Sequence, residues 1–298
     1  MSTYERLDVS LPDGRRLCVR RSPGRGRPVV LLHGLLDDST GWTRVMERLG
    51  HPCVAVDLPG FGGSSLPTRP RIADFADDVA AGLAELGIVH ATLVGHSLGG
   101  AVAVAVAERS AAVDSLALLA PAGFGPIGLA DFAARPGVAA LTQAAIPLGL
   151  MNPLVVTAAY STLVAHRRLP PAELVSRVRR TALRGGRGPR MAIEAVAHAG
   201  HARAGFHARR VAFEGPVSVL WGARDALVPL GHADALVRAL PQATVEVWQQ
   251  MGHHPQRERP EALERFLRRA AWVACPRAGR RRPQPTGTRR GAGARRAA

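Results

Sequence analysis

Lysine is absent from this 298-residue chain, and all 39 basic residues are arginines. A net charge of +16 would ordinarily suggest a nucleic-acid or anionic-membrane partner. Eight of the arginines, however, fall in the last 24 residues (275–298), which contain no acidic residue. Because alanine and glycine are also abundant, we interpret the arginine-only usage as coding bias and do not expect a nucleic-acid partner. The Arg/Gly/Pro-rich segment 275–298 is predicted to be a disordered tail.

Cysteine is scarce, with only Cys18, Cys53 and Cys275 far apart in the chain. An odd number of widely spaced cysteines predicts neither a disulfide framework nor a metal cluster, and it favours a reducing, cytoplasmic compartment. Three histidines are close in sequence (His198, His201 and His207), but their spacing matches no strong zinc pattern. We therefore expect no metal and no cofactor.

Long apolar runs are also missing. The N-terminal residues 1–6 are polar and carry no apolar signal core. The longest uncharged run, 136–165, is interrupted by Pro147, Asn152 and Pro153, so we predict no membrane span. An apolar fraction of 47% over this length instead predicts one large globular domain with a possible insertion.

What the sequence does contain is a regular alternation of strand and helix patterns. Residues 6–20 predict two strands around a turn at Pro12-Asp13-Gly14. Buried strands are then predicted at 28–32, 53–56, 91–94, 115–120, 216–223 and 243–248, with helices at 40–49, 72–86, 98 onward, 231–240 and 258–273. Such alternation predicts an α/β fold with a mostly parallel sheet covered on both faces. Its core would comprise 1–123 and 214–274.

The alternation stops between 124 and 213, which we predict to be a helical cap inserted over the carboxyl ends of the strands. Its first half is apolar, and these residues either line an acyl pocket or form the core of the cap itself. Its second half is basic, which is more typical of a solvated face than of an anion site. The arginines concerned are Arg167, Arg168, Arg177, Arg179, Arg180, Arg184 and Arg187.

The chain is organised around residues 91–100, ATLVGHSLGG, in which a strand turns directly into a helix. The turn Gly95-His96-Ser97-Leu98-Gly99 fits the G-x-S-x-G pattern, which places a strained serine at the end of a strand with its hydroxyl exposed. Glycine is needed on both sides because neighbouring chain passes close by. The first N–H groups of the helix point at the site where an oxyanion would form.

Two more chemically active residues are predicted at strand ends, Asp225 and His253. A histidine base can activate Ser97, and a buried aspartate can fix the imidazole tautomer. The order Ser, Asp, His fits this architecture. The neighbouring His254 is an alternative candidate for the base.

Gly34 lets the N–H of Leu35 point into the site. The loop 57–64 is either a wall of that site or a rigid connector.

Together these motifs resemble the α/β-hydrolase family over about residues 15–272. The resemblance rests on His33-Gly34, the loop 57–64, the Ser97 turn, W-G-x-x-D-x-x-V-P from Trp221 and G-H-x-P-x-x-E-x-P from Gly252. It implies Ser97 as nucleophile, Asp225 as acid and His253 as base, with an oxyanion hole from the backbone N–H groups of Leu35 and Leu98. His33, Gly34, Gly95, His96 and Gly99 would then be supporting residues.

The resemblance also narrows the function. A serine at position 97 argues against haloalkane dehalogenases and epoxide hydrolases, which use aspartate, and His96 stands where carbon–carbon bond hydrolases usually carry asparagine. Residues 119–125 (LAPAGFG) resemble acyltransferase-like hydrolases linked to acetoin dehydrogenase. Those often carry a lipoyl domain, which this sequence does not predict, so we expect a stand-alone hydrolase.

The favoured function is therefore a carboxylesterase-like serine hydrolase whose substrate is a small molecule with an apolar acyl group. The alternatives are a carbon–carbon bond hydrolase or acyltransferase with the same three residues and, less favoured, a non-catalytic or anion-binding protein on this fold. The oligomeric state and the identity of the substrate are not encoded in these patterns.

Overall fold

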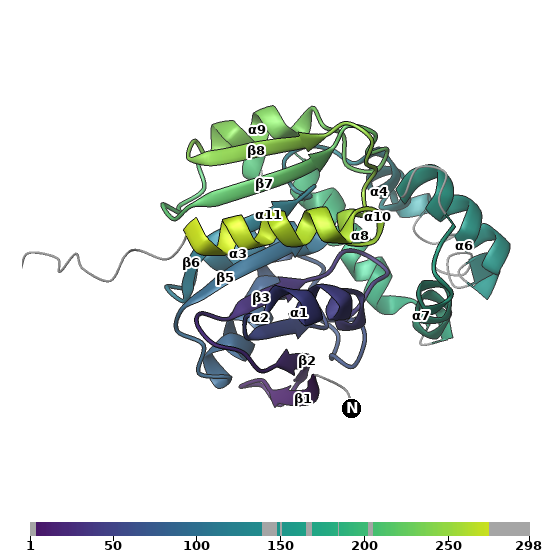
Figure 1. The fold of residues 1–298 in the computed structure, drawn as a ribbon. Coiled ribbons are helices and arrows are strands. Elements are labelled where there is room, and N and C mark those ends of the chain that lie inside the picture. Colours follow the sequence, from purple (N-terminus) through teal and green to yellow (C-terminus); the bar gives the residue numbers. More distant parts are fainter. Residues whose placement is uncertain are drawn as a thin grey trace, which may run out of the picture.

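An eight-stranded sheet lies at the centre of the computed structural model, which describes residues 4–138, 148–149, 151–164, 169–183, 185–201 and 205–273 (Figure 1). The strand order is β1-β2-β4-β3-β5-β6-β7-β8. Strand β2 runs antiparallel to both its neighbours, and all pairs from β4 to β8 are parallel. The strands are β1 (Glu5–Ser10), β2 (Arg16–Ser22), β3 (Val29–Leu32), β4 (Cys53–Val56), β5 (Ala91–His96), β6 (Val113–Leu119), β7 (Val217–Gly222) and β8 (Ala243–Trp248).

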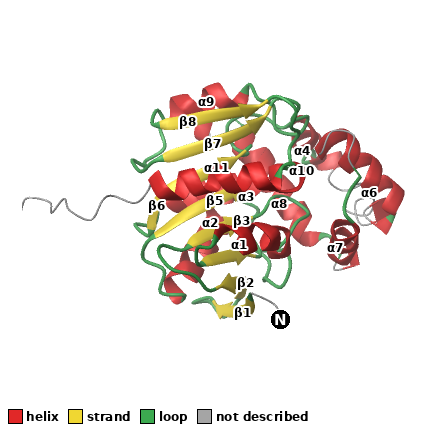
Figure 2. Ribbon diagram, viewed as in Figure 1, coloured by secondary structure: helices red, strands yellow, loops and turns green. Residues whose placement is uncertain are grey.

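Helices cover both faces of the sheet, as the alternating sequence predicts (Figure 2). On one face, α2 (Ile72–Glu85), α3 (Leu98–Ala107) and α9 (His232–Ala239) contribute to the larger hydrophobic core. On the other face, α1 (Thr43–Leu49) and α11 (Pro260–Val273) form a second core with alternate strand residues. The mostly parallel α/β fold class is confirmed.

The element that carries Ser97 is the most deeply buried part of this architecture. All six residues of β5 and all ten of α3 are buried. A strand covered on both faces and a helix enclosed on all sides need no polar stripe, which explains the nearly uninterrupted Ala/Val sequence of α3. The Ser97 turn is consequently held between two rigid elements.

The described part of 124–213, which we call the cap, is helical and contains no strand. It comprises α4 (Gly128–Ala133), α6 (Pro153–Ala159), the π-helical turn η2 (Tyr160–Val164), α7 (Ala172–Leu183), α8 (Arg187–Gly200) and the short 3-10 helix η3 (Phe206–Ala208). Helices α4, α6 and α7 project from the side of the sheet where the parallel strands end (Figure 1). The division of the chain into core and cap stays a prediction.

Two sequence-based expectations are wrong in detail. The helix predicted at 258–273 is α11, which begins two residues later, at Pro260, and a separate short helix, α10 (Pro255–Glu258), precedes it. Arg177, expected on a solvated face, is buried with 5% of its surface exposed because it pairs with carboxylates of the core. Its neighbours in the basic half of the cap are exposed as expected, namely Arg179, Arg180 and Arg187.

Other expectations fall on residues outside those described. They are Arg167, Arg168 and Arg184, part of the apolar segment 136–165, and the tail 275–298 with Cys275. Cys18 and Cys53 are buried free thiols. Among the helices of the described residues, none combines the length and the apolar character that crossing a membrane requires.

Candidate active site

Ser97 lies in a strained backbone conformation at the junction of β5 and α3. Its φ of 53° and ψ of −116° are values that residues other than glycine rarely adopt. Its N–H donates to the Leu119 carbonyl at 2.9 Å, and its own carbonyl accepts from Gly100 and Ala122 at 2.9 and 3.0 Å. The surrounding backbone therefore fixes the strained residue, while its hydroxyl belongs to the lining of a cavity.

The glycines of the turn are required by close contacts. A Cβ atom on Gly95 would lie 2.4 Å from the Gly99 carbonyl oxygen, and one on Gly99 would lie 2.3 Å from that of Leu32. The strand and the helix approach each other more closely than any side chain allows. This explains why glycine occurs two residues before and two residues after Ser97.

His253 and Asp225 lie together because they follow two adjacent strands of the sheet, β8 and β7. His253 Nδ1 is 2.6 Å from Asp225 Oδ2, with 5% and 0% of the two side chains exposed. The other carboxylate oxygen, Asp225 Oδ1, accepts from the N–H groups of Leu227 and Val228, each at 2.9 Å. The carboxylate is therefore held by three contacts. It binds one ring nitrogen of His253, which leaves Nε2 for proton transfer.

Ser97 and His253 line the same cavity. No hydrogen bond joins the Ser97 hydroxyl to His253 in the part of the chain that the structure describes. Such contacts are often long in a substrate-free site and shorten when substrate binds.

Glu258 is a supporting residue to which sequence reasoning assigned no role. Its carboxylate accepts the backbone N–H groups on both sides of His253, from Gly252 and from His254, each at 2.9 Å. Glu258 is itself buried. The loop that carries His253 is therefore tied to α10. The signal was present in the G-H-x-P-x-x-E pattern, but spacing alone does not show that a side chain will accept backbone hydrogen bonds.

Two more buried imidazoles surround His253. The rings of His96 and His253 have centroids 4.7 Å apart, and the ring of His254 lies 4.7 Å from that of His96 and 6.2 Å from that of His253. Burial lowers the pKa of both His96 and His254 well below the usual 6.5, and the neighbouring His253 lowers both further. His96 and His254 are therefore neutral at pH 7, and His96 Nε2 donates to the His253 carbonyl at 2.7 Å.

The loop after β3 carries His33, Gly34 and Leu35. His33 Nδ1 is 2.7 Å from the Gly34 carbonyl, and its Nε2 accepts the N–H of Leu58 at 2.9 Å. His33 thus joins the loop after β3 to the loop after β4, a supporting position. Leu35 and Leu98, the predicted oxyanion donors, both line the cavity beside Ser97. Their backbone roles stay a prediction.

The loop 57–64 does not line the cavity in the described residues. Its Asp57 carboxylate accepts the N–H groups of Ser39 and Gly63, each at 2.7 Å, and Leu58 and Phe61 are buried. Gly60 packs against Gly188 of the cap so closely that a Cβ on Gly188 would lie 1.9 Å from the Gly60 carbonyl oxygen. These contacts favour the rigid-connector interpretation of this loop.

The cavity over Ser97 has a volume of about 440 Å³ and is lined almost entirely by apolar side chains. Most of them come from the cap, including Ile127, Val156, Tyr160, Leu174 and Val178. Val156, Tyr160, Leu174 and Val178 also form a small hydrophobic core within the cap. These described residues therefore do both of the things considered from the sequence: they form the core of the cap, and the inner surface of that core lines the cavity.

The polar lining of the cavity consists of Ser97, Tyr160 and the histidines 96, 253 and 254, with no charged carboxylate or guanidinium group among the described lining residues. Nowhere in the described part of the chain do three His, Cys, Asp or Glu residues form a group able to hold a metal ion. The arrangement consists of a strained serine, a histidine–aspartate pair and an apolar pocket. Such a set can perform nucleophilic chemistry on an uncharged acyl group.

Comparison with known proteins gives relatives with the same fold. The chain is 30% identical over 281 residues to the dihydrolipoyllysine-residue acetyltransferase component of the acetoin cleaving system of Cupriavidus necator, covering 90% of this chain and 69% of that protein. It spans about two thirds of the length of the acetoin-system relatives that it matches. The expected resemblance to that group is confirmed.

Two further relatives are described as esterases. The pimeloyl-[acyl-carrier protein] methyl ester esterase of Chromobacterium violaceum is 33% identical over 251 residues, covering 78% of this chain and 89% of that one. A thermophilic esterase from Thermogutta terrifontis, solved with malate bound, superimposes with a TM-score of 0.69 at 26% identity over 90% of this chain and 98% of its own.

A family model described as the alpha/beta hydrolase fold matches residues 27–260, from the start of β3 to the start of α11. The matched span includes the turn at Ser97, the Asp225–His253 pair and the whole cap. With the sheet order and these relatives, the match shows that this chain belongs to the α/β-hydrolase family.

Proposed function

We propose that this protein is a carboxylesterase-like serine hydrolase, which cleaves a carboxylic ester or related acyl bond through an acyl-enzyme on Ser97. One observation carries the proposal. Ser97, in its strained turn, lines the same apolar cavity as His253, and the Nδ1 atom of His253 is bound by the buried Asp225 carboxylate. This combination supports activation of a serine hydroxyl, and the apolar lining of the cavity supports an acyl substrate.

In the first half of the reaction, the Ser97 hydroxyl attacks the ester carbonyl carbon while His253 Nε2 accepts its proton. The Asp225 carboxylate, bound to Nδ1–H, stabilises the imidazolium that results. The backbone N–H groups of Leu35 and Leu98 would donate to the oxyanion of the tetrahedral intermediate. His253 then returns the proton to the leaving alcohol, and the acyl group stays on Ser97.

In the second half, His253 takes a proton from water, and the hydroxide so formed attacks the acyl-enzyme. The intermediate collapses with expulsion of Ser97, which regains its proton from His253. The neutral state of His96 and His254 supports this cycle. A second positive charge so close would disfavour the imidazolium of His253 in both halves.

The cavity favours an uncharged, apolar acyl group. A substrate carboxylate would enter a volume in which no described lining residue carries a compensating charge, and burying an unpaired charge is strongly unfavourable. This argues against the ring-cleavage acids on which carbon–carbon bond hydrolases act. Acyl transfer stays the second candidate because the relative from Cupriavidus necator is described as an acetyltransferase component.

Hydrolysis of p-nitrophenyl esters from acetate to dodecanoate by the native protein and by Ser97→Ala tests the proposal. We expect p-nitrophenol release by the native protein with a preference for a medium chain, and a fall to the uncatalysed rate in the variant. Equal activity in both proteins would refute Ser97 as nucleophile. A parallel reaction containing ethanol separates the two candidates, because an acyltransferase would form the ethyl ester in preference to the free acid.

A further inference from the structure

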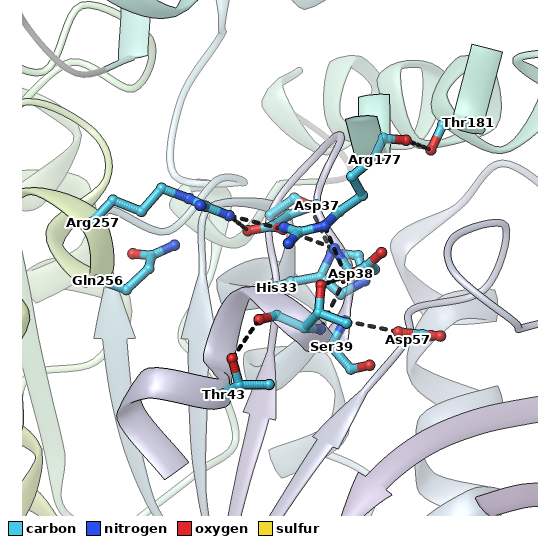
Figure 3. Close-up of polar contacts among 12 residues, drawn as sticks. His33, Asp37, Asp38, Ser39, Thr43, Asp57, Arg177, Thr181, Gln256 and Arg257 are labelled. Atoms are coloured by element: carbon cyan, nitrogen blue, oxygen red, sulfur yellow. Dashed lines mark hydrogen bonds and ion pairs between the residues drawn. The ribbon is translucent and has the colours of Figure 1, made fainter. Parts of the chain in front are cut away.

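A cluster of four charged side chains lies behind the cavity, at the place where three segments of the site meet. Asp37 follows Leu35 in the loop after β3, Arg177 belongs to cap helix α7, and Arg257 belongs to α10. Figure 3 shows the Asp37 carboxylate between the two guanidinium groups. Arg257 Nη2 lies 3.1 and 3.2 Å from the two Asp37 oxygens, and Arg177 Nη1 pairs with Asp37 Oδ1.

The cluster is balanced and enclosed. Arg177 also pairs with Asp38, its Nε lying 3.0 Å from Oδ1, so two carboxylates face two guanidinium groups. The side chains of Asp37 and Arg177 are 1% and 7% exposed. Burial opposes ionisation of Asp37, but Arg257 and Arg177 outweigh it and hold the pKa of that carboxyl well below its usual range. The Asp37 carboxyl therefore stays ionised at any pH at which the protein would be assayed.

This position connects the cap to the cavity. Leu174 and Val178, the neighbours of Arg177 on α7, line the cavity, and so does Leu36, the neighbour of Asp37. Elsewhere the cap meets the core through apolar packing of α8 in the larger core and through the Arg209–Glu108 ion pair. Two backbone contacts add to these, since the His253 N–H donates to the Val164 carbonyl at 2.7 Å and Gly188 packs on Gly60. Arg177 is thus the side chain whose charge fixes α7 against the loop that carries Leu35.

We propose that Arg177 is a positioning residue that determines acyl-chain specificity: by pairing with Asp37 and Asp38, it holds the α7 wall of the pocket over Ser97. An acyl chain long enough to fill the cavity must contact Leu174 and Val178, whereas an acetyl group bound at Ser97 is too small to fill it. Loss of the ion pair therefore penalises long chains more than short ones. The acyl substrate named in this inference rests on the proposed function, whereas the pairing of Arg177 with Asp37 and Asp38 does not.

The test compares Arg177→Met, Arg177→Lys and, as a matched control, Arg180→Met from the exposed side of the same helix. The quantity measured is the ratio of kcat/KM for p-nitrophenyl octanoate to that for p-nitrophenyl acetate. We expect Arg177→Met to lower this ratio about tenfold, the equivalent of fewer than two buried methylene groups. Arg177→Lys keeps the charge but is shorter, so it should give a ratio between those of the native protein and Arg177→Met, and Arg180→Met should leave the ratio unchanged.

A purely structural role would lower the amount of active protein and reduce both rates equally. An unchanged ratio in Arg177→Met, with or without a lower melting temperature, would therefore overturn the inference. Arg177→Lys keeps the test falsifiable if the methionine variant fails to fold, because its shorter reach should still reduce the ratio measurably and an unchanged ratio would refute the proposal.

A binding measurement separates this inference from the proposed function. In the Ser97→Ala background, displacement of the neutral dye Nile red by 1-octanol and by 1-butanol gives a chain-length ratio without turnover. The inference predicts that adding Arg177→Met lowers this ratio even if the protein hydrolyses no ester. Equal ratios with and without Arg177→Met would contradict it.

Discussion

Removing the Glu258 carboxylate should loosen the loop that carries His253. In Glu258→Ala, the N–H groups of Gly252 and His254 would lose their acceptors in a buried environment. Hydrogen bonds to a charged group are each worth about 1.5–3 kcal/mol. The expected loss of unfolding free energy is therefore about 3–6 kcal/mol, and about half of that for Glu258→Gln, whose amide oxygen still accepts one of the two bonds.

The same change should reduce turnover, because these two bonds flank the catalytic histidine of the proposal. A displacement of about 1 Å in a reacting group can cost on the order of 100-fold in rate. We expect kcat for a p-nitrophenyl ester to fall by about that factor in Glu258→Ala and by less in Glu258→Gln. Urea denaturation and steady-state kinetics measure the two effects on the same protein sample.

Glu261 provides the matched control, since its side chain is 59% exposed on α11 and pairs only with an exposed arginine among the described residues. Glu261→Ala should change the unfolding free energy by no more than about 0.5 kcal/mol. The reasoning would be refuted if Glu258→Ala also stayed within that range, or if it lost stability while keeping the kcat of the native protein.

Three further outcomes follow from the site. Asp225→Asn should lower kcat about 10⁴-fold with little change in fold, because the amide no longer stabilises the required tautomer and cation of His253; unchanged kcat would remove Asp225 from the mechanism. Gly95→Ala places a Cβ 2.4 Å from the Gly99 carbonyl oxygen, so its melting temperature should fall sharply, whereas Gly128→Ala, at the start of α4 with no atom within 4 Å of the added Cβ, should not lower it. The pKa of His96 lies well below 6.5 in the folded protein, so the unfolded chain binds more protons as the pH falls. Unfolding free energy should therefore decline below about pH 6.5, and His96→Gln should flatten that decline in urea titrations at pH 5 and 7.

The sheet and the placement of Ser97, Asp225 and His253 could be predicted because both depend on local patterns. Continuous apolar runs mark strands covered on both faces, and the carboxyl ends of parallel strands meet at one edge. Residues that follow such strands must therefore converge whatever the details of packing. The close contacts of Gly95 and Gly99 are likewise dictated by the turn itself.

The cap could not be predicted in the same way. Arg177 stands in a run of basic residues that resembles a solvated face, and its partner Asp37 lies 140 positions earlier in the chain. No periodicity encodes a pairing over that distance, because it depends on how α7 packs against the core. Glu258 was missed for a related reason, since the groups that donate to its carboxylate are backbone N–H groups, which every residue except proline carries. The break at Arg259 has a local cause instead, because Pro260 disfavours a helical conformation of the residue before it, and Arg259 has φ −145° and ψ 61°.

Covalent trapping tests the central claim most directly. The native protein, Ser97→Ala and His253→Ala would be treated with an alkyl fluorophosphonate and digested, and the adduct would be located by mass spectrometry. The account predicts one adduct on the native protein, at Ser97, formed much more slowly in His253→Ala and absent from Ser97→Ala. An adduct at another residue, or labelling of Ser97 at the native rate without His253, would contradict it.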